Sequence, residues 1–143
     1  MARRILDTNQ LINAWHRFRD GRPSQNCTAA DARAWGQRYA TEGDIVRPVL
    51  IEFLCKVKTP HELRLYETFL EQFKLADGGR VIQQDWDVAE EIAKSIMKER
   101  PPRHRGSKVK AFKQRDLSDC LIEAICRRLR RECKTDDRGY PKS

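Results

Sequence analysis

The sequence predicts an α/β fold in which helices cover both faces of a parallel sheet. Three short apolar segments are predicted as strands, at residues 3–6, 44–48 and 80–83. Between and after them lie longer segments whose apolar residues recur every three or four positions, which is typical of amphipathic helices. Short apolar strands that alternate with helices favour a buried parallel sheet. We therefore expect one α/β domain over residues 1–143.

Helices are predicted at about residues 9–19, 28–40, 49–57, 59–75, 85–99 and 117–133. The clearest start is at Thr59, an expected N-cap that Pro60 follows at the first helical position. Glu62 could complete a capping box there. Pro101 and Pro102 are expected to end the fifth helix, because proline lacks the backbone N–H that a helix interior needs.

The composition is that of a small, highly charged chain with enough length for a real core. It has 143 residues, of which 39% are hydrophobic and 35% charged. The 29 basic residues exceed the 21 acidic ones, and the net charge of +8 favours polyanionic partners, most often nucleic acid. No apolar run is long enough to cross a bilayer and no secretory signal is evident, so a cytoplasmic protein without a membrane partner is expected. The five cysteines include no CxxC pair and are expected to be small core residues.

Acids from distant parts of the sequence are expected to meet at one edge of the predicted sheet. Asp7 directly follows the first strand, Glu52 lies about one turn into the helix after the second, and Asp119 lies near the start of the last helix. In such folds, strand C-termini and helix N-termini share the functional edge. The last helix descends roughly 18–20 Å and the segment after it can climb back roughly 16 Å, which returns Asp137 to that edge.

Four carboxylates at close range repel one another unless a cation lies between them. Oxygen ligands suit Mg²⁺ or Mn²⁺, and a water on such an ion can attack a phosphodiester. The sequence therefore predicts metal-dependent phosphodiester hydrolysis. The expected catalytic and metal-binding residues are Asp7, Glu52, Asp119 and Asp137.

Each acid also has an ordinary structural explanation. Asp7 could be the N-cap of the first helix, Glu52 a surface acid, and Asp119 a residue at N3 that the helix dipole favours. The acids near residue 137 could belong to a polar tail. Because all four are predicted at one edge, we expect Asp7 to be a ligand and the cap role to pass to Thr8 or Asn9.

Four segments have the order and rough spacing of a known family. They are ILDTNQLI, RPVLIEFLCKV, DLSDCLIEAICRRL and TDDRGY, and together they extend over nearly the whole chain. They resemble PIN-domain ribonucleases, above all the small VapC-type toxins of bacterial toxin–antitoxin pairs. The resemblance implies a three-layer α/β/α sandwich with a central, mostly parallel sheet of four to five strands. It also implies a Mg²⁺- or Mn²⁺-dependent endoribonuclease, often a homodimer inhibited by an antitoxin protein.

The resemblance also assigns roles to single residues. The acids that match the family's four are Asp7, Glu52, Asp119 and Asp137. Asn9 matches the polar residue that orders the first acid, and Thr135 matches the hydroxyl residue before the fourth.

The chain departs from the family pattern at several positions. Asp116 is an extra acid one turn before the third acid and could take its role. Asp136 stands where Asn is frequent, so either Asp136 or Asp137 could be the fourth acid. Glu123 and Ala124 occupy positions where the family usually has two small residues. A further C-terminal strand of the family is expected to be absent or rudimentary, because the chain ends soon after the fourth motif.

A basic segment leads directly to Asp119 and is expected to hold RNA. Residues 98–115 contain eight Lys or Arg residues and one acid. The expected RNA-binding residues are Arg103, Arg105, Lys108, Lys110, Lys113 and Arg115. His104 and Phe112 could stack on unpaired bases, and the alternative is a solvated loop. A second cluster, the arginines at 127, 128, 130 and 131, is expected to be a solvated or partner-binding face.

The functional expectation is an endoribonuclease toxin with an RNA substrate and an antitoxin partner. Two alternatives stay open. One is a non-catalytic RNA-binding module on a PIN-like fold, and the other is a DNA-directed metal-dependent nuclease.

Overall fold

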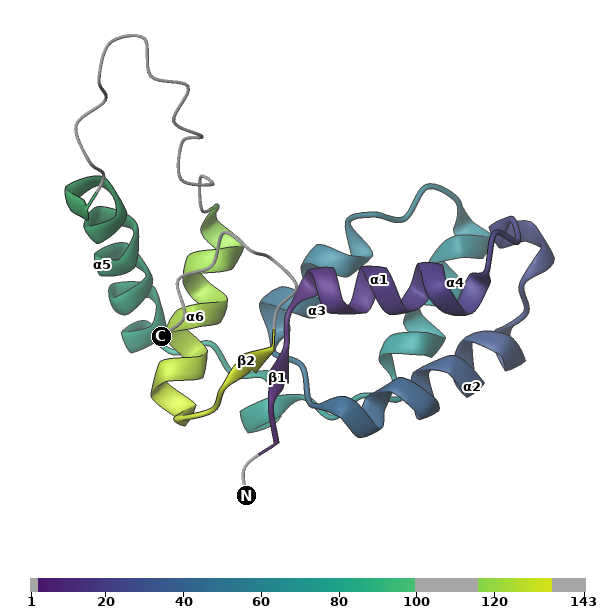
Figure 1. Ribbon diagram of the computed structural model, residues 1–143, viewed down its shortest axis with the longest axis horizontal. Coiled ribbons are helices and arrows are strands. Elements are labelled where there is room, and N and C mark those ends of the chain that lie inside the picture. Colours follow the sequence, from purple (N-terminus) through teal and green to yellow (C-terminus); the bar gives the residue numbers. More distant parts are fainter. Residues whose placement is uncertain (1–2, 100–115, 135–143) are drawn as a thin grey trace, which may run out of the picture.

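The computed structural model of the chain describes residues 3–99 and 116–134, and helices dominate them (Figure 1). The α-helices are α1 (Thr8–Arg19), α2 (Ala29–Tyr39), α3 (Arg47–Leu54), α4 (Pro60–Leu70), α5 (Gln83–Glu99) and α6 (Leu117–Leu129). The 3₁₀ turns are η1 (Ser24–Asn26), η2 (Ala40–Glu42) and η3 (Ala76–Gly79). The strands are β1 (Ile5–Leu6) and β2 (Cys133–Lys134). In these ranges, no helix is long and apolar enough to cross a membrane.

The predicted α/β/α sandwich around a sheet of four to five strands is wrong. In the described ranges, β1 and β2 form a parallel pair of two residues each. Two isolated parallel bridges, Ile5–Asp44 and Ile45–Leu75, are the remaining strand-like contacts there. Neither of the segments predicted as the second and third strands forms a strand.

Local helix signals explain why those two segments fail as strands. Pro48 stands in the first turn of α3, where its fixed φ suits a helix start, so the helix begins at Arg47 inside the segment predicted as a strand. At the third segment, α5 begins at Gln83, and Asp85 Oδ2 accepts the backbone N–H of Ile82 at 2.9 Å. Three residues of each segment, 44–46 and 80–82, lie before the helix. So short a strand cannot offset the entropy lost when it is ordered in a sheet.

The predicted helix starts at Thr28 and Thr59 are confirmed. Thr28 and Asp31 form a complete capping box at the start of α2. At α4, Thr59 Oγ1 accepts the backbone N–H of Glu62 at 3.1 Å. The predicted return bond to Thr59 is not the one that forms, because Glu62 Oε1 accepts the backbone N–H of Lys58 at 2.9 Å.

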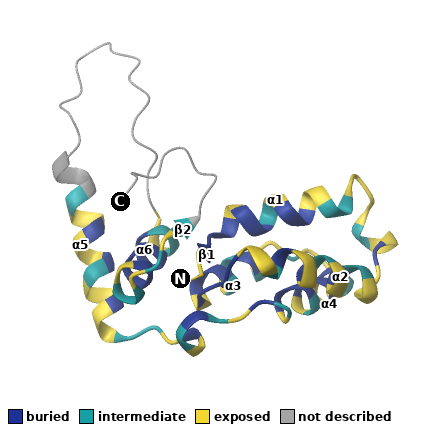
Figure 2. Ribbon diagram, turned by 60° about the horizontal axis from the view of Figure 1, so that its bottom comes forward, coloured by how far each residue is buried: buried dark blue, intermediate teal, exposed yellow. Residues whose placement is uncertain are grey.

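An aromatic cluster forms the core between α1, α2, α3 and α4. Trp15 of α1 is 1% exposed and lies edge-on to four rings. Those rings are Trp35, Phe53, Tyr66 and Phe69, at centroid distances of 5.0–6.5 Å. A Cβ at Gly36 of α2 would lie 2.6 Å from the carbonyl oxygen of Phe69, so glycine lets α2 approach α4 closely. Figure 2 shows buried and exposed residues on each of these helices, as an amphipathic pattern requires.

The cysteines are all free thiols, and no cysteine among the described residues takes part in a disulfide. Cys27, Cys120 and Cys126 are buried, which confirms the prediction of small core residues for these three. Cys55 is exposed, so the same prediction is wrong for it.

The C-terminal end of α6 is tied to acids far away in the sequence. Arg128 Nε lies 2.7 Å from Asp85 Oδ1 and its Nη1 lies 2.7 Å from Asp77 Oδ2. Arg131 Nη2 lies 2.6 Å from Oδ2 of the buried Asp44. The prediction of a solvated or partner-binding face is therefore wrong for these two arginines, whereas Arg130 is exposed.

The Asp77 carboxylate makes folding sensitive to acid. Hydrogen bonds from Arg80, and next from Arg128, hold the pKa of Asp77 below its ordinary value of 3.8. A folded-state pKa below the unfolded one means that this stabilisation is complete above about pH 4 and is lost as the pH falls through the folded value. We therefore expect Asp77→Asn to lose less free energy of unfolding than wild type between pH 5 and a pH of about 2.

Urea unfolding at a series of pH values measures this difference. Asp87→Asn, which removes an exposed aspartate on the first turns of α5, is the matched control and should follow wild type. Equal acid sensitivity of wild type and Asp77→Asn would contradict the role of the ion pairs.

Candidate functional site

Asp7 lies at the junction of β1 and α1 and is 3% exposed. Its Oδ1 accepts the backbone N–H of Gln10 at 2.9 Å, and its backbone is extended, so Asp7 itself is the N-cap of α1. The expectation that Thr8 or Asn9 would take the cap role is therefore wrong. Asn9 is exposed on the first turn of the helix. A cap is ordinarily a surface feature, whereas this one holds a carboxylate away from water, where the helix dipole favours its negative charge.

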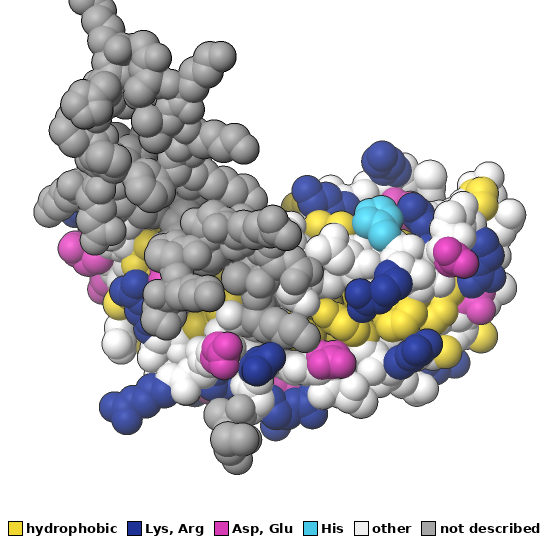
Figure 3. All heavy atoms as spheres, in the orientation of Figure 1, with side chains coloured by type: hydrophobic (Ala, Val, Ile, Leu, Met, Phe, Trp, Pro, Cys, Tyr) yellow, Lys and Arg dark blue, Asp and Glu magenta, His cyan; other side chains and the backbone are white. Residues whose placement is uncertain are grey.

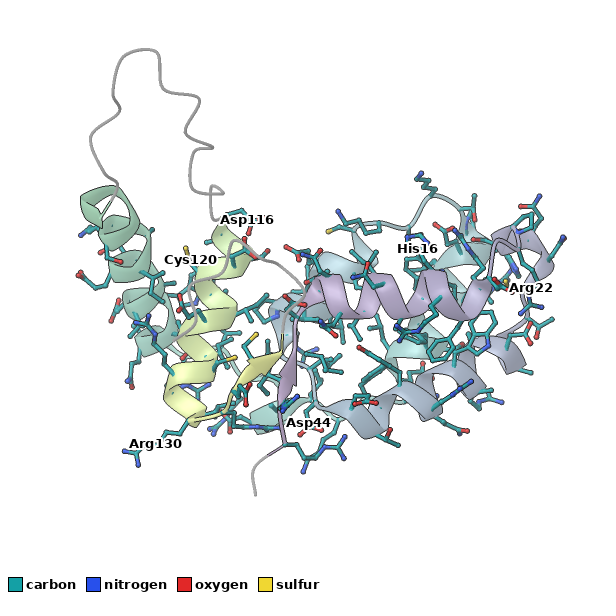
Figure 4. The ribbon with its side chains drawn as sticks, viewed as in Figure 1. His16, Arg22, Asp44, Asp116, Cys120 and Arg130 are labelled. Atoms are coloured by element: carbon teal, nitrogen blue, oxygen red, sulfur yellow. The ribbon has the colours of Figure 1, made fainter. Side chains whose placement is uncertain are left out.

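Asp116 and Asp119 share a capping box at the start of α6. The backbone N–H of Asp119 donates to Asp116 Oδ1 at 2.9 Å, and that of Asp116 donates to Asp119 Oδ2 at 3.4 Å. Asp116 is exposed and Asp119 is half-buried. The structural explanation of Asp119 as an N3 acid is thus confirmed, and it leaves the proposed ligand role untested. Figure 4 labels Asp116 at this end of α6 and Arg130 at the opposite end.

Glu52 lies in the second turn of α3 and is half-buried. Its neighbour Ile51 is 52% exposed, so α3 is not the fully buried helix that its apolar sequence predicts. α3 packs against both α1 and α6. Asp7, Glu52 and Asp119 therefore sit on three elements that are joined through α3.

The other predicted site residues lie outside the described ranges. They are Arg103, Arg105, Lys108, Lys110, Lys113, Arg115, Thr135, Asp136 and Asp137. Their assignments stay predictions.

Glu123 is a buried acid on α6 to which the sequence interpretation gave no role. It is 8% exposed, and its Oε1 lies 3.1 Å from Arg127 Nη2. The pKa of the Cys133 thiol is raised by a hydrogen bond with Cys126 and by burial, and further by the charges of Cys126, Asp7 and Glu123. Asp7 and Glu123 thus both act on the one thiol of β2. Glu123 could have been recognised in the sequence from its position four residues after Asp119, because that spacing puts Asp119 and Glu123 on one face of the helix.

The chemistry of these side chains suits a hard divalent cation, but the described acids do not complete a metal centre. Carboxylate and hydroxyl oxygens are suitable ligands, and Thr8 Oγ1 is buried without a hydrogen-bond partner in the described part of the chain. Among the same residues, no three His, Cys, Asp or Glu side chains form a group that could hold a metal ion.

Comparison with known proteins finds no relative of this chain. No family model, curated protein or solved structure matches this chain. The likeness to PIN-domain ribonucleases thus stays a resemblance that four sequence motifs carry.

Proposed function

We propose that this chain is a divalent-metal-dependent endoribonuclease that hydrolyses RNA phosphodiester bonds. The observation that carries the proposal is the Asp7 carboxylate, which is 3% exposed at the start of α1. A buried carboxylate supplies the hard oxygen ligand that Mg²⁺ or Mn²⁺ prefers. Glu52 stands on α3, which packs against both α1 and α6, and Asp119 lies at the start of α6, so the candidate acids belong to elements in contact with one another.

The biological role proposed here is that of the toxin in a type II toxin–antitoxin pair. The four motifs support it by resemblance, and the net charge of +8 supports an RNA substrate. A cytoplasmic location, a homodimer and an antitoxin protein as inhibitor belong to the same proposal.

The proposed reaction divides between the metal ion and the side chains of the protein. Mg²⁺ or Mn²⁺, when bound, supplies an activated water and stabilises charge on the phosphate. The carboxylates of Asp7, Glu52 and Asp119, with Asp136 or Asp137, are the ligands it would need. The N-termini of α1 and α6 favour an anion through the helix dipole, which suits a phosphate group at this edge. The basic segment before Asp119 would draw the RNA strand.

Metal-dependent cleavage tests this proposal directly. Wild type is expected to cut an end-labelled single-stranded RNA with Mg²⁺ or Mn²⁺, to stop with EDTA, and to recover when excess metal is returned. Asp119→Asn is expected to cut roughly 100-fold more slowly or worse, because it removes one charge that holds the metal. Rates are read from denaturing gels.

Asp31→Asn is the matched control for Asp119→Asn. Asp31 is also an N3 acid in a capping box, at the start of α2. Its variant should cut RNA like wild type. If the Asp31 and Asp119 variants behave alike, Asp119 is a capping residue and the catalytic assignment fails.

A non-catalytic RNA-binding module is the second candidate, and the net charge of +8 supports it as it supports an RNA substrate. It predicts RNA binding that EDTA does not change, with no cleavage under any metal. A single-stranded DNA of the same sequence in the same assay addresses the third candidate, a DNA-directed nuclease. Preferential cleavage of that DNA would replace RNA as the substrate.

A further inference from the structure

A pocket of about 550 Å³ lies between α1, the end of α3 and the segment that leads to α4. This volume is in the range of small-molecule sites. Apolar lining comes from Ile12 of α1, Phe53 of α3, Val57 of the segment between α3 and α4, and Tyr66 of α4. Burial, and next the charge of Glu62, raises the pKa of the Tyr66 hydroxyl, so that group is neutral at neutral pH and can donate a hydrogen bond.

The mouth of this pocket is cationic. Arg19, Lys56 and Lys58 line it together with the exposed imidazole of His16. Glu62 is the acid among the described lining residues, and both of its oxygens accept hydrogen bonds, from Lys58 N at 2.9 Å and from Ser24 Oγ at 2.8 Å. Figure 4 labels His16 on α1, and Figure 3 shows a histidine with Lys, Arg and hydrophobic side chains around it on this face. The rim therefore attracts an anion.

Two buried N–H donors in the wall have no acceptor among the described residues. They are Nε1 of Trp15, whose side chain is 1% exposed, and Nε of Arg19. Buried donors without partners are rare in folded proteins and call for an explanation. Both side chains line the pocket, but a ligand oxygen reaches these two N–H groups only if the side chains around them move when it binds.

We propose that this pocket binds one nucleotide of a single-stranded RNA. The base stacks on His16 and contacts the apolar lining, and the phosphate pairs with Lys56 and Lys58. The proposal rests on RNA being the substrate. The pocket residues of α1 lie one to three turns after Asp7, roughly 8–18 Å along the helix axis, so one short strand can reach both places.

Cys55 supplies a reporter for occupancy because it lines the pocket and is an exposed free thiol. Wild type is treated with N-ethylmaleimide in EDTA, and alkylation of the Cys55 peptide is followed by mass spectrometry. The additions are a single-stranded RNA oligomer, each nucleoside 5′-monophosphate, or polyphosphate of matched charge. RNA is expected to slow alkylation of Cys55 about tenfold at saturation.

The additions separate the sources of the ligand. Protection by monophosphates as well as by RNA supports the pocket as a site for a free nucleotide, and protection by RNA alone supports a strand subsite. Equal protection by polyphosphate overturns the proposal, because it shows that the pocket binds anions and that a nucleobase does not contribute to binding. No protection by any of these ligands overturns it too, and leaves a partner protein as the occupant to seek.

Variants test the assigned contacts through RNA binding, measured by fluorescence anisotropy in EDTA at several salt concentrations. Lys56→Ala with Lys58→Ala is expected to reduce the slope of log affinity against log salt by about two. His16→Ala is expected to weaken binding about tenfold. Lys74→Ala with Lys94→Ala removes two exposed charges elsewhere and is the matched control. If this control pair has the same effect as the pocket pair, the pocket makes no specific contact.

Failure of this inference and failure of the proposed nuclease are distinguishable. All binding is measured without metal, so the cleavage assay does not enter it. A protein that shows Cys55 protection and cuts no RNA keeps the pocket and rejects the nuclease. A protein that cuts RNA and shows no protection rejects the pocket alone.

Discussion

Asp7→Asn is expected to reduce the rate of metal-dependent RNA cleavage roughly 100-fold or more. Its free energy of unfolding is expected to stay within about 1 kcal/mol of the wild-type value. Asparagine caps helices as well as aspartate, so its side-chain oxygen can still accept the backbone N–H of Gln10. The substitution therefore removes the negative charge and keeps the cap. It separates the role that the structure shows for Asp7, a helix cap, from the role that is proposed for it, a metal ligand.

Asp7→Ala is the companion variant, because it removes both roles. Losing the cap costs about 1 kcal/mol in the free energy of unfolding, and cleavage should fall as it does for Asp7→Asn. Cleavage rates and urea unfolding of the two variants together decide whether Asp7 is a metal ligand as well as a helix cap. If Asp7→Asn cuts RNA at the wild-type rate, the buried carboxylate is a helix cap and the nuclease site must lie elsewhere.

Arg128→Ala is expected to lower the free energy of unfolding by about 3–5 kcal/mol. The Arg128 side chain is 14% exposed and lies against Asp85, whose side chain is 0% exposed. Alanine would leave that carboxylate buried without its cation, and its desolvation penalty would no longer be offset. Asp77 would lose one of its two arginine partners as well.

Arg130→Ala is the matched control for this effect. Arg130 is exposed just past the end of α6, and its replacement should change stability by no more than about 0.5 kcal/mol. Chemical denaturation at pH 7 compares the two variants. Similar values for both would show that the buried ion pair contributes nothing beyond a surface charge.

The ion pairs of Arg128 bear on the candidate site because α6 carries Asp119 at its other end. An Arg128→Ala protein that remains folded at low temperature should still bind RNA. Its activity should fall with the folded population on warming, whereas Asp119→Asn should be inactive at every temperature. The different temperature dependence of the two variants distinguishes a residue that stabilises the fold, Arg128, from a residue proposed to act in catalysis, Asp119.

Much of the helical structure could be predicted from the sequence. Apolar spacing predicted the six α-helices that the described residues form. The caps at Thr28 and Thr59 were assigned correctly because capping is decided within four residues. Helix ends were less accurate. α4 stops at Leu70, five residues before its predicted end, and Arg130 ends α6 in a left-handed conformation that no residue type there signals.

The sheet could not be predicted because strand pairing is non-local. Ile5 is buried and pairs with Cys133 on one side and Asp44 on the other, yet each contact covers one or two residues. A short apolar segment has the same sequence pattern whether it pairs with a neighbouring strand over many residues or forms one isolated bridge. Competing helix starts at Arg47 and Gln83 decided the outcome.

By itself, the sequence determined the helices, the positions of Asp7 and Asp119 at helix starts, and the basic charge of the chain. Each depends on neighbours a few residues away or on composition alone. Only the tertiary structure decided that Asp7 is a buried cap, that Arg128 is an internal cation, and that His16 and Lys56 share the rim of a pocket. These features join residues as much as 51 positions apart, and burial and ion pairing at that separation depend on how helices pack rather than on local preference.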